Sequence, residues 1–500
     1  MKTLLSRKLS LVFLIVQFLI SAALVGVAFY VGFIPLKYIV ALIVLCLFLL
    51  AYEVFSQMTD KTYIVGRVLC ALICFFYIGG GYYCVNTYSA IDEMAGQQVK
   101  VDEISCIVLK DDPAQSIYDT KDYTFGILAA NDRENTNKAL AEVQAAIGKE
   151  PATIEYQDND TLIDALYAKD VKVIVINEAN RSPIEEYYKT FSDDTRVLNT
   201  HKVETVIQED EKLDDITKTP FNVYLSGIDV YGSIKATSRS DVNVIVTVNP
   251  NTKQILLTST PRDYYVPLTV SNGIPDKLTH AGNYGVEASI DTLQNLYGID
   301  IDYYVKINFT GCVSVVDALG GITIDSEVEF TCGEDASPIP YHFVKGPNEC
   351  DGEMAVAFSR ERHAFAAGDF QRGRNQTAAI KGILQKATSP AILTKYSAVL
   401  DAVSDMFLTN IPTSTISDLV KLQLSDSTAW NIQTYSIEGS TQPPAGQGPA
   451  YLEITGLRGA SVVYPYADSI NTAIQLMSKI QNGDVFDVDE YVDSLNNNSN

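Results

Sequence analysis

Three long apolar runs open the chain and are separated by short breaks. They cover about Leu9–Phe33, Tyr38–Phe55 and Tyr63–Val85. A helix needs about 20 apolar residues to cross the hydrocarbon core of a bilayer, and each run is close to that length. A cleaved signal peptide would be one shorter run with a small-residue cleavage site, so the pattern predicts three retained transmembrane helices within residues 1–90.

Basic residues around these runs predict their orientation. Three precede the first run, one lies between the first two, and two flank the start of the third: Lys2, Arg7, Lys8, Lys37, Lys61 and Arg67. Cytoplasmic segments collect Lys and Arg, so we expect the N-terminus in the cytoplasm and everything after about residue 86 outside the cell. Group transfer by the outer part must then use an activated donor held in the membrane, because cytosolic ATP is out of reach.

Residues 96–215 alternate between strand and helix patterns. Strands are expected at three short segments, Tyr123–Ala129, Thr153–Tyr156 and Val171–Ile176. Helices are expected after Asp132, where apolar residues recur every fourth position to Ile147, and at Asp160–Ala168. This alternation favours a partly parallel sheet. The segment carries no Gly-rich loop or paired catalytic set, and we predict a small α/β accessory domain.

The pattern over residues 216–482 predicts a second, larger α/β domain. A strand at Phe221–Leu225 precedes a hairpin formed by Val242–Val248 and Gln254–Ser259. Helices follow at Tyr284–Leu296, Gly311–Leu319, Gly352–Ser359 and about Arg372–Ala387. Residues 483–500 are acidic, rich in Asn and Ser and poor in apolar residues, so we expect a disordered tail there.

The charge balance differs between the apolar region and the rest of the chain. The first 85 residues carry six basic and two acidic side chains, a balance of +4, and the whole 500-residue chain is at −24, which leaves −28 for the remainder. Phosphate repels such an acidic body, which argues against a nucleic-acid partner. A basic cluster inside it is therefore a candidate binding site.

Eight cysteines are present, four of them beyond the apolar region: Cys106, Cys312, Cys332 and Cys350. An exported chain can pair them, and a Cys332–Cys350 disulfide would close a short loop. Unrelated buried thiols are the equally weighted alternative. No Cys-x-x-Cys spacing points to zinc, and the four histidines are scattered.

Two aspartates stand beside predicted strand ends. Asp229 follows Gly227-Ile228, and Asp241 closes the segment Ser238-Arg239-Ser240-Asp241. Two carboxylates that meet at one point suit a hard divalent ion such as Mg²⁺, with Mn²⁺ as an alternative, because Mg²⁺ prefers oxygen ligands and shares its shell with phosphate oxygens. Turn formation is the competing interpretation, since Asp is common in the loops at strand ends.

Arginines gather in two later segments. Thr260-Pro261-Arg262-Asp263 follows the second hairpin strand, where Arg262 either faces the two aspartates or forms a structural pair with Asp263. Between Ser359 and Gln376 there are four arginines and no lysine: Arg360, Arg362, Arg372 and Arg374. Guanidinium groups form planar, two-point hydrogen bonds to phosphate oxygens that lysine cannot match. Together, the aspartates and arginines indicate a pyrophosphate site with a metal on one side and guanidinium groups on the other.

The ordered set of motifs resembles the LytR–CpsA–Psr domain. It comprises Asn222-x-x-Leu225-x-Gly227-x-Asp229, Ser238-Arg239-Ser240-Asp241, Asn249-Pro250, Pro261-Arg262-Asp263, Lys277-x-x-His280-Ala281, Asp317-Ala318-Leu319-Gly320-Gly321-Ile322, Arg360-x-Arg362 and Arg374-Asn375-Gln376. Each motif is weak alone, but their order over Phe221–Lys386 is specific. The three N-terminal helices and the extra domain are similar to the capsule-associated CpsA branch of streptococcal type.

The resemblance implies a fold, a substrate and a reaction. The fold is an extracytoplasmic α/β core with a central mixed sheet flanked by helices. Members of the family bind a polyprenyl-pyrophosphate glycan at the outer membrane face, with the lipid tail in an apolar tunnel. They transfer the glycan with its proximal phosphate to peptidoglycan and release polyprenyl phosphate. A capsule-export complex is a further candidate partner besides the bilayer, and the polymer, of capsular or teichoic-acid type, stays open.

The resemblance also implies roles for single residues. Asp229 and Asp241 are expected to hold the metal, and Asp241, Arg262 and Asp263 to act in catalysis. The pyrophosphate clamp is expected to comprise Arg239, Arg262, Arg360, Arg362, Arg374 and Gln376, with Arg372 added on proximity alone. Many relatives have Arg-Gln-Gln where this chain has Arg374-Asn375-Gln376, so the choice between Arg372 and Arg374 stays open. Cys350 also stands where an apolar residue is usual.

Two other functions would use the same residues. With water in place of the sugar hydroxyl, the protein would be a polyprenyl-pyrophosphate phosphatase. Without turnover, it would be a membrane sensor that binds lipid-linked sugar and regulates capsule assembly, although a pure binder has no need of the aspartates. The segments expected in the cytoplasm are too short for a DNA-binding domain.

Overall fold

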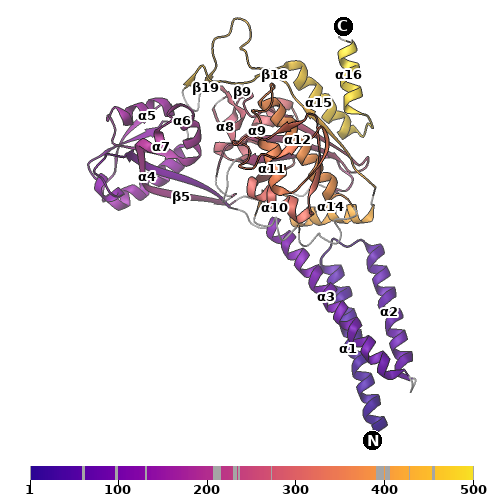
Figure 1. Cartoon of the computed structure of the whole chain (residues 1–500). Helices are drawn as coiled ribbons and strands as arrows, with labels where there is room; N and C mark the ends of the chain where they lie inside the picture. Colours follow the sequence, from indigo (N-terminus) through magenta and orange to yellow (C-terminus); the bar gives the residue numbers. More distant parts are fainter. Residues whose placement is uncertain are drawn as a thin grey trace.

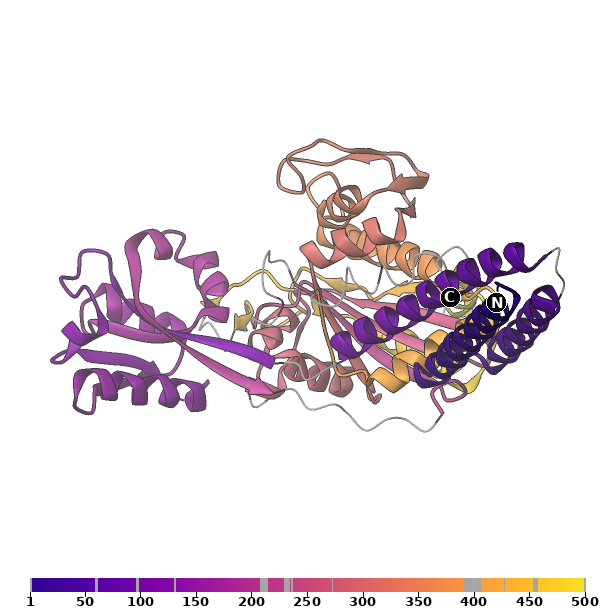
Figure 2. The same cartoon turned by 90° about the horizontal axis from the view of Figure 1, so that it is seen from below.

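The computed structural model has three parts, namely a rod of three helices, a small domain to one side and a large domain that meets one end of the rod (Figure 1). It describes residues 2–58, 62–95, 99–129, 132–206, 215–228, 234, 237–271, 273–389, 399, 406–426, 428–452 and 457–498. Viewed from below, the rod lies under the large domain and the small domain extends away from it (Figure 2).

The rod consists of the predicted N-terminal helices. They are α1 (Lys2–Tyr30), α2 (Leu36–Met58) and α3 (Tyr63–Ala95). All three are long and apolar enough to cross a membrane. Large apolar side chains such as Phe18, Phe48 and Phe75 are exposed along them, a pattern that suits lipid rather than water.

The small domain is a five-stranded mixed sheet with helices on both faces. Its strands are β1 (Val99–Leu109), β2 (Thr124–Leu128), β3 (Ala152–Tyr156), β4 (Val173–Asn177) and β5 (Thr195–Val206). Its helices are α4 (Arg133–Ile147), α5 (Asn159–Tyr167), α6 (Arg181–Tyr187) and α7 (Phe191–Asp194). The order is β3-β2-β4-β1-β5, parallel from β3 to β4 and antiparallel at β1. The predicted partly parallel sheet is confirmed.

The large domain is built on a six-stranded mixed sheet with the order β16-β11-β6-β7-β8-β17. The strands are β6 (Phe221–Ile228), β7 (Val242–Asn249), β8 (Gln254–Thr260), β11 (Tyr303–Asn308), β16 (Phe407–Thr409) and β17 (Asn431–Ser436). β6 is parallel to β11 and β8 to β17, while the hairpin β7–β8 is antiparallel. The predicted hairpin and the α/β class with a central mixed sheet are confirmed.

One face of this sheet carries the main core. Tyr224, Ile245 and Leu256 from the strands pack there against four helices. These helices are α8 (Leu278–Ala281), α9 (Val286–Tyr297), α15 (Ala467–Asn482) and α16 (Val488–Asn498). The core thus holds the sheet rigid from behind.

The opposite face of the sheet looks toward a second layer of helices. They are α10 (Phe309–Leu319), α11 (Gly352–Arg360), α12 (Asp369–Ala387) and α14 (Thr413–Ser425). A separate core joins α10, α11 and α12 to two small hairpins, formed by β12 (Ile322–Ser326) with β15 (Gly346–Cys350) and by β13 (Phe330–Thr331) with β14 (His342–Phe343). This arrangement leaves space between the sheet and the helices.

Short strand pairs close the edge of the large domain. β9 (Tyr265–Pro267) pairs with β10 (Pro275–Lys277), β18 (Gly439–Ser440) with β21 (Tyr464–Pro465), and β19 (Tyr451–Leu452) with β20 (Leu457–Arg458). The pairing of β9 with β10 places α8 directly after β10, close to the ends of β7 and β8.

The prediction of a disordered C-terminal tail is wrong. Residues Val488–Asn498 form helix α16, in which Val488 is buried and Tyr491 and Val492 pack on the main core. The side chain of Gln433 on β17 also fastens this end, because it accepts from the amide of Val488 (2.7 Å) and donates to the carbonyl of Phe486 (2.9 Å). A few apolar residues at helical spacing are enough to fold an otherwise polar segment against a preformed surface.

The proposed Cys332–Cys350 disulfide is also absent. Both residues are buried free thiols, and Cys332 Sγ donates to the carbonyl of Ala357 at 3.4 Å. Burial raises the pKa of each thiol to about 12, with a smaller contribution from nearby carboxylates. The alternative of unrelated buried thiols therefore describes these residues.

Candidate active site

Asp241 and Arg262 meet because they flank two neighbouring antiparallel strands. Asp241 immediately precedes β7 and Arg262 follows β8, and the ladder between the strands ends at the pair Asn243–Thr260. A terminal nitrogen of Arg262 donates a 2.6 Å hydrogen bond to the carboxylate of Asp241. The side chains are only 15% and 9% exposed, so the charges act on each other with little screening by water.

The short helix α8 joins the two loops that carry these residues. The amide of Thr279 donates to the carbonyl of Arg262 (2.9 Å), and the carbonyl of Thr279 accepts from the amide of Ser240 (3.3 Å). Gly282 lies against the same loop, where a Cβ would come within 2.8 Å of backbone atoms of Ser238 and Ser240. This close approach of backbones fixes the loop before β7 to the loop after β8.

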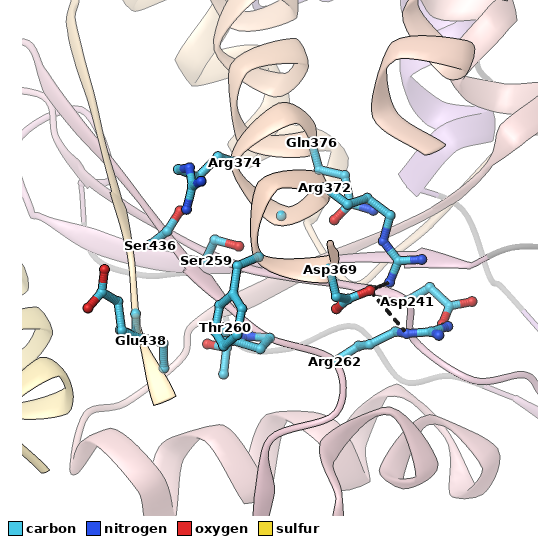
Figure 3. Close-up of a pocket in the computed structure, with 14 residues that line it drawn as sticks. Asp241, Ser259, Thr260, Arg262, Asp369, Arg372, Arg374, Gln376, Ser436 and Glu438 are labelled. Carbon is cyan, nitrogen blue, oxygen red and sulfur yellow. Dashed lines mark hydrogen bonds and ion pairs between the residues drawn. The ribbon is translucent and has the colours of Figure 1, made fainter. Parts of the chain in front are cut away.

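Arg262 is surrounded by carboxylates from three segments. Besides the bond to Asp241, its Nε lies 3.8 Å from Asp263 and 3.9 Å from Asp369 at the start of α12. Arg372, one helical turn further, forms a 2.5 Å ion pair with Asp369 (Figure 3). The structure thus brings together four of the residues selected from the sequence, Asp241, Arg262, Asp263 and Arg372.

These pairings set the charge of the buried groups. Burial alone would raise the pKa of Asp241, but the guanidinium groups of Arg262, Arg239 and Arg372 more than offset it, so this pKa lies below its ordinary value. Burial would lower the pKa of Arg262, but the surrounding aspartates raise it above its ordinary value. At neutral pH Asp241 is therefore ionised and Arg262 is protonated.

Two guanidinium donors at this point lack an acceptor. The Nε atoms of Arg262 and Arg372 are buried and make no hydrogen bond to any described part of the chain. A buried donor without a partner costs about 1–3 kcal/mol. An anion with several oxygens would satisfy both donors, so the site has the chemistry of an anion-binding site.

The accessory domain reaches this site through Glu186 on α6. Its carboxylate accepts a 2.6 Å hydrogen bond from Arg239 and lies 3.5 Å from Nζ of Lys277. Lys277 also lies 3.4 Å from Asp263. Burial would lower the pKa of Lys277, but Asp263 and Glu186 raise it, so Lys277 is cationic. One acidic residue of the accessory domain thus neutralises part of the positive charge that the large domain gathers.

A cavity of about 780 Å³ lies between the central sheet and the second layer of helices. One end is lined by charged and polar side chains, among them Arg239, Asp241, Arg262, Arg360, Arg362, Arg372 and Gln376, together with the carboxylates of Glu186, Asp335 and Glu361. The rest is apolar, with Phe221, Val246 and Ile307 from the sheet and Ile380 and Leu384 from α12. The cavity therefore suits a ligand with an anionic head and a long apolar tail.

Three predicted clamp residues extend the charged end. The guanidinium of Arg360 lies over the ring of Phe309, 4.7 Å from its centroid, and donates to the carbonyl of Ala336 at 3.3 Å. Arg362 is exposed and its Nε donates to His363 at 3.1 Å. Gln376 lies one turn beyond Arg372 on the same side of α12 (Figure 3).

Arg374 and Asp263 are predicted residues that do not line this cavity. Arg374 is on the opposite side of α12 from Arg372 and Gln376, and its Nε donates to Glu327 at 2.9 Å (Figure 3). It lines only a smaller hollow of about 30 Å³ next to Arg262, together with Ser436 and Glu438. Asp229 lies outside the described residues.

Three residues of the site were missed in the sequence. Asp369 stands in the segment Gly368-Asp369-Phe370 and Lys277 opens the Lys277-x-x-His280 motif, so both had a signal in motifs already noted. Glu186 had none, because nothing in the local sequence of the accessory domain indicates a contact with a residue more than 50 positions away.

The described residues fit a metal only if a substrate shares it. No group of three or more His, Cys, Asp or Glu in the described part of the chain can hold an ion. In phosphate sites Mg²⁺ usually takes one or two carboxylates and completes its shell with phosphate oxygens and water. Asp241, buried and ionised beside the arginines, supplies one such carboxylate.

Comparison with known proteins places the large domain in a family. A model of the LytR_cpsA_psr family matches residues 184–462. Among solved structures, B. subtilis TagV has a TM-score of 0.43 and 26% identity, covering 53% of this chain and 98% of its own. The structure described as TagT bound to LI-WTA has a TM-score of 0.41 and 25% identity, covering 55% and 96%.

Two relatives carry the name polyisoprenyl-teichoic acid–peptidoglycan teichoic acid transferase TagU. The Bacillus anthracis protein is 34% identical over 203 residues, which cover 40% of this chain and 64% of the relative, less than two thirds of it. The Enterococcus faecalis protein is 36% identical over 215 residues, which cover 43% of this chain and 68% of the relative. With a family model that spans more than half of its residues, this chain belongs to the LytR_cpsA_psr family.

Proposed function

We propose that this protein is a membrane-anchored phosphotransferase that moves a glycopolymer from polyprenyl pyrophosphate to peptidoglycan and releases polyprenyl phosphate. The observation that carries the proposal is a cavity of about 780 Å³ with arginines at one end and mainly apolar side chains along the rest. A polyprenyl-pyrophosphate glycan likewise has a charged pyrophosphate group and a long apolar tail. The names of the TagU relatives support a glycopolymer of teichoic-acid type and a peptidoglycan acceptor, and a capsular polysaccharide is the alternative cargo.

The pyrophosphate binds between Arg262 and Arg372, where it satisfies their unpaired Nε donors. Arg239, Arg360 and Arg362 line the same end of the cavity and add positive charge. Hydrogen bonds from cationic donors to phosphate oxygens are short and strong, and more so where water is excluded. Binding of the head therefore fixes the phosphorus atom that reacts.

In the reaction, a hydroxyl oxygen of a peptidoglycan sugar forms a bond to the phosphorus next to the glycan. The bond from that phosphorus to the bridging oxygen breaks, and polyprenyl phosphate leaves with the electron pair. Negative charge accumulates on the leaving phosphate, and Arg262 and Arg372 stabilise it. Phosphoryl transfer depends mainly on such positioning and charge stabilisation.

The proton of the attacking hydroxyl passes to a carboxylate beside Arg262. Asp241 is unsuited, because its pKa is held below its ordinary value by three guanidinium groups. Asp263 and Asp369 are the other two carboxylates beside Arg262, at 3.8 and 3.9 Å from its Nε. Separate Asp263→Asn and Asp369→Asn variants distinguish them, since loss of the base lowers the transfer rate while binding of the donor persists.

Asp241, together with Asp229 outside the described residues, would hold Mg²⁺ or Mn²⁺ against the pyrophosphate oxygens. A bound divalent ion supplies further neutralisation of the phosphate charge. The ionised state of Asp241 suits this role. A capsule-export complex is a further candidate partner of the outer domains.

The orientation in the membrane follows from the basic residues. Those at the N-terminus and around the α2–α3 connection favour the cytoplasmic side. The large domain joins the opposite end of the rod (Figure 1), which supports a location of both domains outside the cell, on the side of the peptidoglycan.

The test uses the full chain in detergent with a short-chain polyprenyl-pyrophosphate glycan, a peptidoglycan oligomer and Mg²⁺. Mass spectrometry of the products is expected to show a glycan–phosphate–peptidoglycan adduct and polyprenyl phosphate. Release of glycan phosphate without an adduct would show that the protein is a phosphatase and not a transferase. Tight binding of the donor without any product would favour a sensor of lipid-linked sugar over an enzyme.

A further inference from the structure

Helix α14 is packed against the membrane helices. Ile416, Val420 and Leu424 on one side of α14 belong to a single apolar cluster with Val31 and Phe33, which follow α1, and with Ile91 near the end of α3. Val31, Ile91 and Val420 are almost fully buried in this cluster. The contact is therefore a packed junction between the large domain and the end of the rod (Figure 1).

Hydrogen bonds fasten α14 to this junction at both ends. At its N-terminal end, Thr413 donates to the carboxylate of Asp92 on α3 at 3.4 Å. At its C-terminal end, Lys37 donates to the carbonyl of Ser425 at 2.7 Å and Tyr38 to that of Leu424 at 3.3 Å, both from the start of α2. The helix is thus held across the end of the rod.

The same helix lines the apolar part of the cavity. Ile416, Leu419, Val420 and Leu424 face it, and the neighbouring polar residue Gln423 binds Trp430 (2.7 Å) and the carbonyl of Thr388 (2.5 Å). Because the amide of Gln423 has partners on both sides, this end of the cavity stays apolar. Three of the residues that pack on the membrane helices are therefore also cavity residues.

The length of α12 gives the distance between the charged end and the apolar end of the cavity. Seven of its residues line the cavity in one row from the charged end onward: Arg372, Gln376, Ala379, Ile380, Ile383, Leu384 and Ala387. At roughly 1.5 Å per residue, the row is about 22 Å long. It runs from the arginines to the neighbourhood of α14, so the cavity connects the charged site with the junction to the membrane helices.

We propose that α14 and the ends of α1–α3 form the portal through which the polyprenyl tail passes between the bilayer and the cavity. Exposing a tail to water is unfavourable in proportion to its apolar area, so a long tail cannot leave the bilayer unprotected. The apolar cluster that joins the membrane helices to the cavity wall through α14 offers the tail an apolar route that lowers this cost. The inference rests on the proposed function and adds to it that the helices guide the substrate as well as anchor the domain.

The first test separates the portal from the cavity. The variant Lys37→Ala/Tyr38→Phe removes two bonds that hold α14, and neither residue lines the cavity. The full chain is reconstituted in phosphatidylglycerol–phosphatidylethanolamine vesicles that contain a long-chain donor, and is assayed in parallel in detergent with a donor whose tail is too short to span the cavity. Tyr52→Phe, an exposed tyrosine of α2, is the matched control.

We expect the double variant to lose at least fivefold in initial rate with the long-chain donor and to match the native protein with the short-chain donor. Equal rates with the long-chain donor would overturn the portal, and so would an equal loss with both donors, because that result places the effect at the charged site. A native protein that is inactive with both donors would instead contradict the proposed function.

A second variant narrows the portal from the side of the cavity. Leu419→Trp adds bulk on the lining face of α14, and Ser414→Trp adds the same bulk at an exposed position of the helix. The first is expected to slow only the long-chain reaction, by about tenfold or more, and the second to leave both reactions unchanged. Unimpaired transfer from the long-chain donor by Leu419→Trp would show that the tail does not pass α14.

Discussion

Arg262 contacts carboxylates from three segments, yet its Nε stays without a hydrogen bond in the described part of the chain. The aspartates hold the guanidinium in place and keep it protonated, while the free donor is left for a ligand. A guanidinium fixed in advance has little left to reorganise when charge develops on a phosphate. This explains why one residue can both organise the site and act on the substrate.

Removing this guanidinium should abolish most of the transfer. We expect Arg262→Ala to lower the rate by about 10³–10⁵-fold, by analogy with arginines that stabilise phosphoryl transfer elsewhere. Initial rates with the short-chain donor measure the effect. Arg133→Ala, which breaks a surface pair with Glu155 in the accessory domain, is the control and should keep full activity. An active Arg262→Ala protein would remove Arg262 from the mechanism.

Because Lys306 on β11 is buried, we expect the free energy of unfolding to depend on pH. Burial, and then the charge of Lys100, lowers its pKa from 10.5 to about 8, although Glu287 and Asp102 oppose the shift. Between about pH 8 and 10.5 the unfolded chain keeps the proton that the folded chain has lost, so the free energy of unfolding rises with pH over this window. Below about pH 8, Lys306 is charged in the folded state, which then carries the full free-energy cost of a buried charge.

Lys306→Met should therefore stabilise the protein near neutral pH by up to roughly 3 kcal/mol. The gain should shrink as the pH rises above about 8, because the folded native protein then loses the buried charge. Urea unfolding of the full chain in detergent at several pH values measures the difference. Lys138→Met, at an exposed pair with Glu134 on α4, should show no such trend, and a pH-independent gain for Lys306→Met would be inconsistent with the shift.

At the scale of elements, α12 shows how helical geometry sorts neighbouring arginines. Two residues along a helix correspond to about 200° of rotation. Arg372 therefore faces the cavity with Gln376, while Arg374 points to the other side and pairs with Glu327. The spacing of charged residues on α12, rather than their number, decides which of them face the cavity.

The strands beside the site are packed too closely to accept even a methyl group at Gly227. A Cβ there would lie 2.7 Å from Cβ and from Cγ2 of Val242 on the neighbouring strand. Gly227→Ala should destabilise the protein by about 1–3 kcal/mol, as overpacking of a core does. In Gly373→Ala on α12, by contrast, the nearest atom would be Ser259 Oγ at 3.7 Å. Gly373→Ala should be at least as stable as the native protein, with a gain of up to about 0.5–1 kcal/mol. Thermal unfolding that ranks the two variants in the opposite order would contradict the packing argument.

At the scale of the whole molecule, the accessory domain supplies a carboxylate at the end of the cavity where the proposed substrate would place its phosphates. Glu186 forms ion pairs with Arg239 and Lys277. A pyrophosphate that binds to Arg239 must therefore displace the carboxylate of Glu186. Because the pair is partly exposed, its strength is modest, at about 0.2–1 kcal/mol. The contact links the position of the accessory domain to the affinity of the catalytic site.

Glu186→Gln should therefore bind the short-chain donor about 1.4- to fivefold more tightly, the equivalent of that energy range. Isothermal titration of the full chain in detergent measures the affinity. Glu185→Gln changes the adjacent carboxylate, which accepts from Ser192 within the accessory domain, and should bind as the native protein does. Weaker binding by Glu186→Gln would mean that Glu186 orients Arg239 instead of competing with the substrate.

The sequence by itself determined the features that depend on local pattern. Apolar runs of membrane-spanning length predicted α1–α3, and strand and helix periods predicted part of the elements of both domains, among them β2, β4, α5 and the β7–β8 hairpin. The ordered motifs indicated the family and selected Asp241, Arg262 and Asp263, because residues just outside adjacent hairpin strands must lie near one another. These inferences need only backbone geometry and neighbours in the chain.

Only the tertiary structure decided which distant side chains meet. It brought Asp369 and Lys277 to Arg262 and Asp263, and Glu186 to Arg239, through contacts between segments far apart in the sequence. It likewise turned Arg374 away and folded α16 onto the core, against the expectation of a disordered tail. The reason is physical, since the direction of a side chain on a helix and the surface available to a polar segment are set by what packs against them, and the local pattern does not contain that information.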